Sequence, residues 1–291
     1  MLQLSLDMCN PSKLIDAPKR FQQFWLNFSR EYLDATPHRG YELLDEWCQG
    51  GRLPCLLRPL PNLGASHLTS CPWWIYSSNV DGHFRRFKSF DGPLCEIHGV
   101  ALEYKCACGI GFSNGEARLG KEWDRWNQHV STMELCKQTV VQMNDILLEE
   151  LRGSDNIFLC CHCKQPMRPN VLMFHDTDEN VIHSIFDQRA KYQAWEAQIE
   201  DDVVANNRKL VILELGCGVN VPAVRQESEE VLLDCANRIK LQCPNTESSV
   251  SMIRVNPKNA EVDLAKASTI SIFSNAASAL EQIDMWLKLM E

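Results

Sequence analysis

The segment Lys209–Gly216, with the sequence KLVILELG, is the strongest single constraint on the fold of this chain. Its residues are nearly all aliphatic and do not alternate with polar ones, which is typical of a strand that is covered on both faces. The glycine-containing turn Gly216-Cys217-Gly218 follows, and a helical stretch starts near Pro222. A buried strand, a tight turn and a helix are units of an α/β fold. We therefore expect a Rossmann-like parallel sheet with helices on both faces.

Other segments fit this class. Apolar residues at helical spacing predict helices, and short β-branched or aromatic runs predict strands. The expected helices cover residues 18–35, 40–49, much of 122–152, and 276–290. The expected further strands are WWIYSS at 73–78, ALEYKC at 101–106 and VSMIRVN at 250–256.

Composition excludes several classes of protein. A net charge of -9 argues against a general affinity for phosphate backbones or anionic membranes, so we expect no direct nucleic acid binding and no membrane association. The first residues lack the pattern of an export signal, and no long uncharged apolar run occurs. Fourteen cysteines in a chain of 291 residues then indicate free thiols and a metal site in a reducing compartment, the cytoplasm or nucleus.

Four cysteines have the spacing of metal ligands. Cys106-Ala-Cys108 and Cys160-x-x-Cys163 are separated by a long, partly helical insertion. Two thiolate pairs suit tetrahedral Zn²⁺ in a small structural lobe. The first pair is tighter than usual, so Cys161 or His162 could substitute as a ligand. Scattered buried thiols are the alternative interpretation.

Polar residues and glycines gather at predicted strand ends. Asn79 and Asp81 follow the 73–78 strand, Gly216 and Gly218 follow the aliphatic strand, and Asn256 ends the 250–256 strand. Open α/β sheets bind ligands at the carboxyl ends of their strands, and a helix N-terminus behind a glycine turn favours anionic groups. Turns prefer the same residue types, which is the structural alternative.

His98 precedes Gly99 and the first cysteine pair. Most single histidines are structural. This one lies downstream of Asn79 and Asp81, and a neutral imidazole there could take a proton from a hydroxyl group.

The order of these motifs resembles the sirtuins, which are NAD-dependent protein deacylases. SSNVDGHF is followed by EIHG, a cysteine eight residues beyond the histidine, CCHCKQPMRPNVLMF, LGCGVNVPA and IRVNP. The similarity runs from about Asp7 to the C-terminus. RPNVLMF and VPAVR are most similar to a bacterial-type branch of the family.

The resemblance implies a role for each matching residue. Asn79 and Asp81 would engage nicotinamide and its ribose, and His98 would be the catalytic base. Gly216 and Gly218 would line the phosphate and ribose path of NAD, and Asn256 would hold the adenosine ribose. The strand from Val171 to Phe174 would pair with an acyl-lysine protein or peptide, and zinc would be held by Cys106, Cys108, Cys160 and Cys163.

The implied reaction transfers the acyl group of a modified lysine to ADP-ribose and releases nicotinamide. The implied domains are a Rossmann-like NAD-binding domain, residues 1–104 and 165–291, and a zinc-binding lobe with a helical insertion, residues 105–164. NAD and Zn²⁺ are the implied cofactors.

The sequence departs from the family pattern in three places. We expect the first strand and its Gly-Ala-Gly-x-Ser loop to be missing, through a truncated gene model or a degenerate relative. His175 stands where the family has glycine, and Gly216-Cys217-Gly218 replaces Gly-Thr-Ser. Two alternatives to deacylation follow: a noncatalytic, zinc-stabilised interaction protein, and an NAD-dependent protein ADP-ribosyltransferase.

Overall fold

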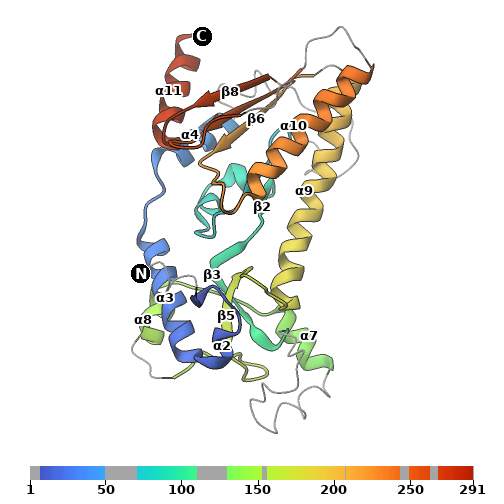
Figure 1. Cartoon of the computed structure of the whole chain (residues 1–291). Coiled ribbons are helices and arrows are strands. Elements are labelled where there is room, and N and C mark those ends of the chain that lie inside the picture. The colour runs from blue at the N-terminus through green and yellow to red at the C-terminus, as the bar shows by residue number, and fades with distance from the viewer. Residues whose placement is uncertain are drawn as a thin grey trace. The chain divides into compact units, whose positions relative to one another are not determined.

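The computed structural model describes residues 7–49, 71–109, 130–152, 156–206, 208–242, 249–262 and 268–290 (Figure 1). The chain divides into two compact units, which are described separately below. Unit 1 comprises Met1–Thr36, Ser77–Gly82 and Glu96–Arg189, and unit 2 comprises Pro37–Tyr76, His83–Cys95 and Ala190–Glu291. The domain division at residues 104 and 165 stays a prediction.

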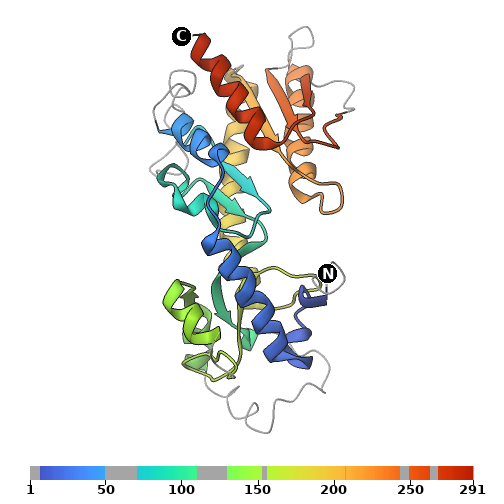
Figure 2. The ribbon, with the colours of Figure 1, turned by 90° about the vertical axis from the view of Figure 1, so that its left-hand side faces the viewer.

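Unit 1 is built on a three-stranded antiparallel sheet in the order β4-β3-β5. Helix α3 packs against β3 and against α8 (Figure 2). The strands are β3 (Gly99–Cys106), β4 (Val140–Gln142) and β5 (Met167–Val171). The helices are α2 (Lys13–Asp16), α3 (Pro18–Asp34), α7 (Val130–Gln138), α8 (Asp145–Arg152) and the 3-10 turn η3 (Ala107–Gly109).

Helix α3 is the predicted aromatic helix of residues 18–35. Pro18 occupies its first turn, where a missing N–H costs nothing. Phe21 and Trp25 are buried in the core of unit 1, together with Tyr104 of β3. Because these aromatic residues recur every three to four positions, one face of the helix meets the sheet.

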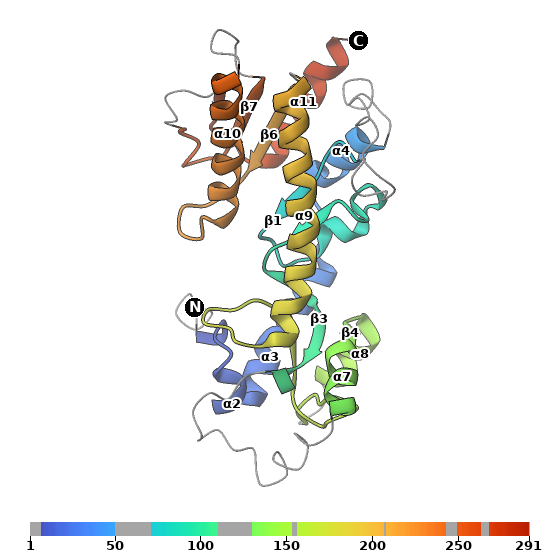
Figure 3. The same ribbon diagram turned by 90° about the vertical axis from the view of Figure 1, so that its right-hand side faces the viewer.

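Unit 2 contains the parallel sheet β6-β7-β8 (Figure 3). Its strands are β6 (Leu210–Leu215), β7 (Val250–Val255) and β8 (Ser268–Ile272). Its helices are α4 (Arg39–Cys48), α10 (Ala223–Gln242), α11 (Ala276–Leu289), the 3-10 turns η1 (His83–Arg86) and η2 (Lys88–Phe90), and the later part of α9 (Glu179–Asn206), which begins in unit 1. Two short strands, β1 (Ile75–Ser77) and β2 (Leu94–Glu96), pair with each other.

The two faces of β6 meet different helices. Leu210 and Ile212 pack with the apolar residues of α9 and α10, whereas Leu213 and Leu215 pack with α4 and α11. A hydrogen bond of 3.0 Å from the Trp47 indole to Asp284 links α4 and α11. The predicted α/β class, with helices on both faces of a parallel sheet, is confirmed.

One predicted helix is wrong in part. Residues 140–142 were counted into a helical stretch that ends at Arg152, but they form strand β4 between α7 and α8. Val140 and Val141 are β-branched and pair with Lys105 and Tyr104 of β3, so strand pairing overrides the helical pattern here. Residues 122–129 of that prediction lie outside the described residues. No helix in the described part of the chain combines the length and apolar character needed to cross a bilayer.

Neighbouring acidic residues on helices α9 and α10 make the stability of the fold depend on pH. Burial and the charge of Glu227 raise the pKa of Glu196 to about 8, with a smaller contribution from Glu200. The folded protein therefore binds a proton that the unfolded chain releases above pH 4.5. Stability falls as pH rises from about 4.5 to about 8.

We expect Glu196→Gln to flatten this dependence of the melting temperature on pH, because the glutamine amide does not titrate in this range. The wild-type free energy of unfolding should change with pH by well below the limit of about 1.4 kcal/mol per pH unit, since Glu196 is partly exposed. Thermal unfolding followed from about pH 5 to about pH 9 measures it. Glu230→Gln, an exposed change on α10, is the control. A slope that survives Glu196→Gln would exclude this carboxyl as its source.

Candidate functional site

Four buried thiols converge in unit 1. The sulfur atoms of Cys106, Cys136, Cys160 and Cys163 all lie within 4.8 Å of one another, and none of these residues is more than 5% exposed. Tetrahedral Zn²⁺ with bonds of about 2.3 Å to sulfur requires sulfur atoms about 3.8 Å apart. The observed separations are 3.8 Å between Cys136 and Cys160 and 3.2 Å between Cys106 and Cys163. The cluster fits a zinc ion with four thiolate ligands.

A tight turn presents Cys160 and Cys163. The Cys160 N–H donates to the Gln165 carbonyl at 2.8 Å, and the Lys164 N–H donates to the Cys160 carbonyl at 3.1 Å. Lys164 has a φ of 61°, the left-handed conformation that closes such a turn. The Ala107 N–H donates to the Pro166 carbonyl, which places Cys106 next to the turn.

Gln22 of α3 holds the two segments that flank this turn. Its amide nitrogen donates to the carbonyls of Phe158 and Met167, at 2.8 and 2.7 Å. Its amide oxygen accepts from the Phe158 N–H at 2.7 Å. Gln22 is buried, so these bonds satisfy a polar group that would otherwise be costly to bury. The motif-based sequence reading missed this residue, because its partners lie more than 100 residues away in the chain.

The structure joins three of the predicted zinc ligands with a cysteine that the sequence reading did not select. Cys136 comes from α7 and belongs to neither spaced pair, so no local signal identified it. Cys108 lies beside the cluster, where the Asn180 amide donates to its sulfur at 3.7 Å. Cys161 is exposed, and neither it nor His162 belongs to the cluster. The role of Cys108 as a ligand stays a prediction.

Asn79, Asp81 and His98 also belong to unit 1. Backbone hydrogen bonds of 2.9 Å from Ile97 to Ser77 and 2.8 Å from Ala101 to Val80 align the two segments that contain them. The His98 ring hydrogen-bonds to the Ser78 backbone. The structure therefore brings the His98 turn and the Asn79 loop together, and their roles toward NAD stay predictions.

His98 has the electrostatics of a proton acceptor. Burial lowers its pKa below the ordinary value of 6.5, and the bond to the Ser78 backbone only partly opposes this. The imidazole is consequently uncharged at neutral pH, which is the form that can accept a proton.

The predicted substrate strand starts at the end of β5. Val171 is buried, whereas Phe174 is 55% exposed. The Leu172 N–H donates to the His98 carbonyl at 2.9 Å, so this strand adjoins the His98 turn. His175 has a φ of 60°, a conformation that glycine adopts without strain, and the family resemblance predicts a glycine at this position.

A buried ion cluster supports the turn after this strand. Arg168 of β5 contacts Asp176 at 2.5 Å and Asp178 at 3.4 Å, and all three side chains are fully buried. Burial raises the pKa of Asp178 to about 6, although the charge of Arg168 opposes it. Burial is also the largest single influence on Asp176, but the hydrogen bonds and charge of Arg168 and two backbone N–H donors together outweigh it and lower the pKa.

Gly216, Gly218 and Asn256 belong to unit 2, at the carboxyl ends of β6 and β7. Asn256 donates to the Cys217 carbonyl at 3.0 Å and accepts from the Lys258 and Asn259 N–H groups, both at 2.9 Å. Its side chain thus ties the glycine turn to the loop after β7. Its role toward a ribose stays a prediction, as does the convergence of this edge with His98.

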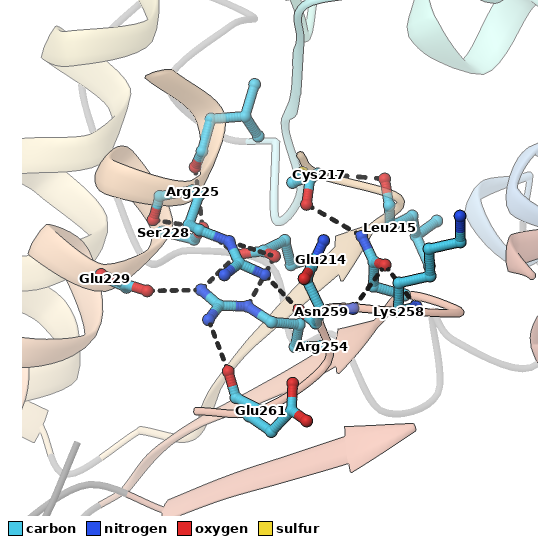
Figure 4. A network of polar contacts seen from close by, with 12 residues as sticks. Glu214, Leu215, Cys217, Arg225, Ser228, Glu229, Arg254, Lys258, Asn259 and Glu261 are labelled. Atoms are coloured by element: carbon cyan, nitrogen blue, oxygen red, sulfur yellow. Dashed lines mark hydrogen bonds and ion pairs between the residues drawn. The ribbon is translucent and has the colours of Figure 1, made fainter. Parts of the chain in front are cut away.

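Below the glycine turn lies a second buried ion pair. Glu214 of β6 contacts Arg254 of β7 at 2.6 Å, and Arg254 reaches Glu229 of α10 at 2.7 Å. The Ser228 hydroxyl also donates to Glu214 at 2.8 Å (Figure 4). This network joins the two strands to α10 directly behind the turn.

No model of a known protein family matches the chain, and no curated protein sequence matches it. Solved structures do match. A Sir2 homologue in complex with NAD has a TM-score of 0.54 at 12% identity, over 98% of this chain and 78% of that one. The chain has a sirtuin-like fold.

Two further structures agree with the sirtuin-like fold. One was solved to study sirtuin substrate affinity, with a TM-score of 0.51 at 15% identity, over 96% of this chain and 84% of that one. The other is a Sir2 mutant with a p53 peptide and NAD, with a TM-score of 0.50 at 14% identity, over 97% and 84%. At these identities the similarity establishes the fold, and the chemistry has to be argued from the residues.

Proposed function

We propose that the protein is an NAD-dependent protein lysine deacylase that acts on acyl-lysine in a protein or peptide. One observation carries this proposal: within a sirtuin-like fold, a partly buried, uncharged His98 lies beside the loop that contains Asn79 and Asp81. A proton acceptor and an amide-carboxylate pair held by adjoining backbone segments suit the activation of a sugar hydroxyl.

The residues at the glycine turn fit a dinucleotide. A Cβ atom added at Gly216 or Gly218 would meet nothing within 4 Å, so the space beside the turn is open to a ligand. The turn lies at the carboxyl end of a parallel strand and precedes α10, the usual position for a phosphate group in such sheets.

Each residue then has a distinct task. Bound NAD would supply the ribose that accepts the acyl group and the nicotinamide that leaves. Asn79 and Asp81 would orient the nicotinamide and its ribose, and His98 would take the proton of a ribose hydroxyl. The extended Val171–Phe174 segment would hold the substrate backbone by strand pairing.

A noncatalytic interaction protein is the second candidate, and two contacts favour it. The Phe174 N–H, a donor that strand pairing with a peptide could use, already donates to the Cys9 carbonyl at 3.2 Å. The Asn256 amide is already engaged by Cys217 of the glycine turn and by Lys258 of its own loop. A protein that binds partners through its zinc-stabilised unit needs neither group free.

The deciding experiment measures nicotinamide release from NAD in the presence of an acetyl-lysine peptide. We expect His98→Ala to abolish release, because no other group is assigned to take the hydroxyl proton, while zinc content and melting temperature stay unchanged. His183→Ala, an exposed histidine on α9, is the matched control and should retain activity. Full activity in His98→Ala would remove His98 from this role. If neither the wild type nor a form extended at its N-terminus releases nicotinamide, the result would favour the interaction protein.

A further inference from the structure

Five thiols gather where a tetrahedral metal ion has four coordination positions. The Cys106, Cys160 and Cys163 sulfurs are common to every arrangement of the centre. The fourth position can be filled by Cys108, two residues beyond Cys106, or by Cys136 of α7. These two choices have different consequences, because Cys108 lies in η3 directly after β3, whereas Cys136 lies in α7 of the insertion.

Distance and burial favour Cys136. Its sulfur lies within 4.8 Å of the other three, and its 3.8 Å separation from Cys160 matches the spacing set by a tetrahedral zinc–thiolate centre. Cys136 is 1% exposed, whereas Cys108 is only partly buried. The Cys108 thiol hydrogen-bonds to those of Cys106, Cys163 and Cys136, but it does not belong to the group of four whose sulfur atoms all lie within 4.8 Å of one another.

Cys108 has a further partner besides these thiols. The Asn180 amide donates to the Cys106 carbonyl at 2.9 Å and to the Cys108 sulfur at 3.7 Å. Asn180 lies in the first turn of α9, where the helix end carries partial positive charge. The Lys105 ammonium donates to the Asn180 carbonyl at 3.1 Å. Zinc with four thiolates carries a net charge of about -2, so positive groups beside it stabilise it.

We propose that Cys136 completes the metal centre with Cys106, Cys160 and Cys163, and that Cys108 is an unligated thiol beside it. The metal then connects helix α7 of the insertion to the end of β3 and to the turn that contains Cys160 and Cys163. Removal of the metal should loosen α7 as well as the turn at Cys160. This proposal concerns the metal alone and does not depend on NAD chemistry.

Cobalt substitution in the full-length protein tests the ligand set. Co²⁺ bound by four thiolates has intense thiolate-to-metal absorption, which weakens when one thiolate is lost. We expect Cys108→Ser to keep the wild-type spectrum and metal content. Cys136→Ser should lose one thiolate and bind the metal at least tenfold more weakly. Cys161→Ser, an exposed neighbour of Cys160, is the control and should match the wild type. The reverse pattern, equal losses, or no loss in either variant would each overturn the proposal.

A second measurement needs no variant, in case Cys136→Ser fails to fold. In the zinc-loaded wild type, alkylation followed by mass spectrometry should label Cys108 and spare Cys136 until a chelator is added. Hydrogen exchange at residues 130–138 should rise on chelation together with exchange at 159–166. Protection of Cys108 together with labelling of Cys136 would contradict the assignment. Hydrogen exchange of the α7 amides that does not change on chelation would contradict it as well.

Discussion

Gly99→Ala should lower the free energy of unfolding of unit 1 by more than about 3 kcal/mol, because the position combines a steric conflict with backbone strain. An added Cβ would lie 2.0 Å from the Asn170 carbonyl oxygen, and Gly99 has a φ of 76°. Since that oxygen is backbone, β3 and β5 have to separate to relieve the contact. The change also displaces the adjoining His98 turn. Urea unfolding, followed by signals from unit 1, measures the loss.

Substitutions at two other glycines separate the steric conflict from the backbone strain. Gly216→Ala meets no neighbour but has a φ of 70°, so strain alone should cost about 1 kcal/mol. Gly218→Ala meets no neighbour and lies outside the left-handed region, so its effect on stability should be close to zero. Equal stability losses in Gly99→Ala and Gly216→Ala would show that the contact with Asn170 contributes nothing.

Arg168→Met should cost about 3 to 5 kcal/mol at neutral pH, because it leaves two buried carboxylates without their cation. The side chains of Arg168, Asp176 and Asp178 have no exposed surface, and Arg168 also donates to the Val171 carbonyl at 2.9 Å. The turn after β5, which contains the predicted substrate strand, should lose its order. Thermal and urea unfolding quantify the effect.

The loss should depend on pH in a definite direction. Without Arg168, burial raises the pKa of Asp176 and Asp178 above the unfolded value, so the folded state binds protons that the unfolded chain releases. Stability of the variant should therefore recover as pH falls toward about 5. Arg30→Met removes an arginine from an exposed network with Asp34, Asp145 and Glu149 and should cost less than about 1 kcal/mol. A pH-independent loss in Arg168→Met would rule out uncompensated carboxylates as its cause.

Local patterns predicted the parts of the structure that depend on nearby residues. The aliphatic run of β6 has no polar alternation, and helices pack on both of its faces, although Val211 in this edge strand is 60% exposed. The aromatic face of α3 and the close approach of Cys160 and Cys163 could be predicted because each depends on residues that are near one another in the sequence. Val140 and Val141 were misread as helix, because their partners on β3 lie more than 30 residues earlier in the chain.

The site itself was predicted less completely than the fold. His98 and the Asn79 loop could be identified from motifs, and their proximity follows from backbone hydrogen bonds between segments 20 residues apart. Asn256 was predicted from its strand-end position, but that pattern could not show that its amide is engaged by Cys217, Lys258 and Asn259.

The sequence by itself determined the α/β class, which rests on side-chain periodicity. Short spacing predicted four thiol ligands, three of which, Cys106, Cys160 and Cys163, lie in the cluster, and the order of the motifs predicted His98 as the base. Only the tertiary structure placed Cys136 beside those thiols, Gln22 across the turn that presents two of them, and Arg168 between two buried aspartates. These contacts join residues that share no local pattern, because they form only when separate helices and strands pack against one another.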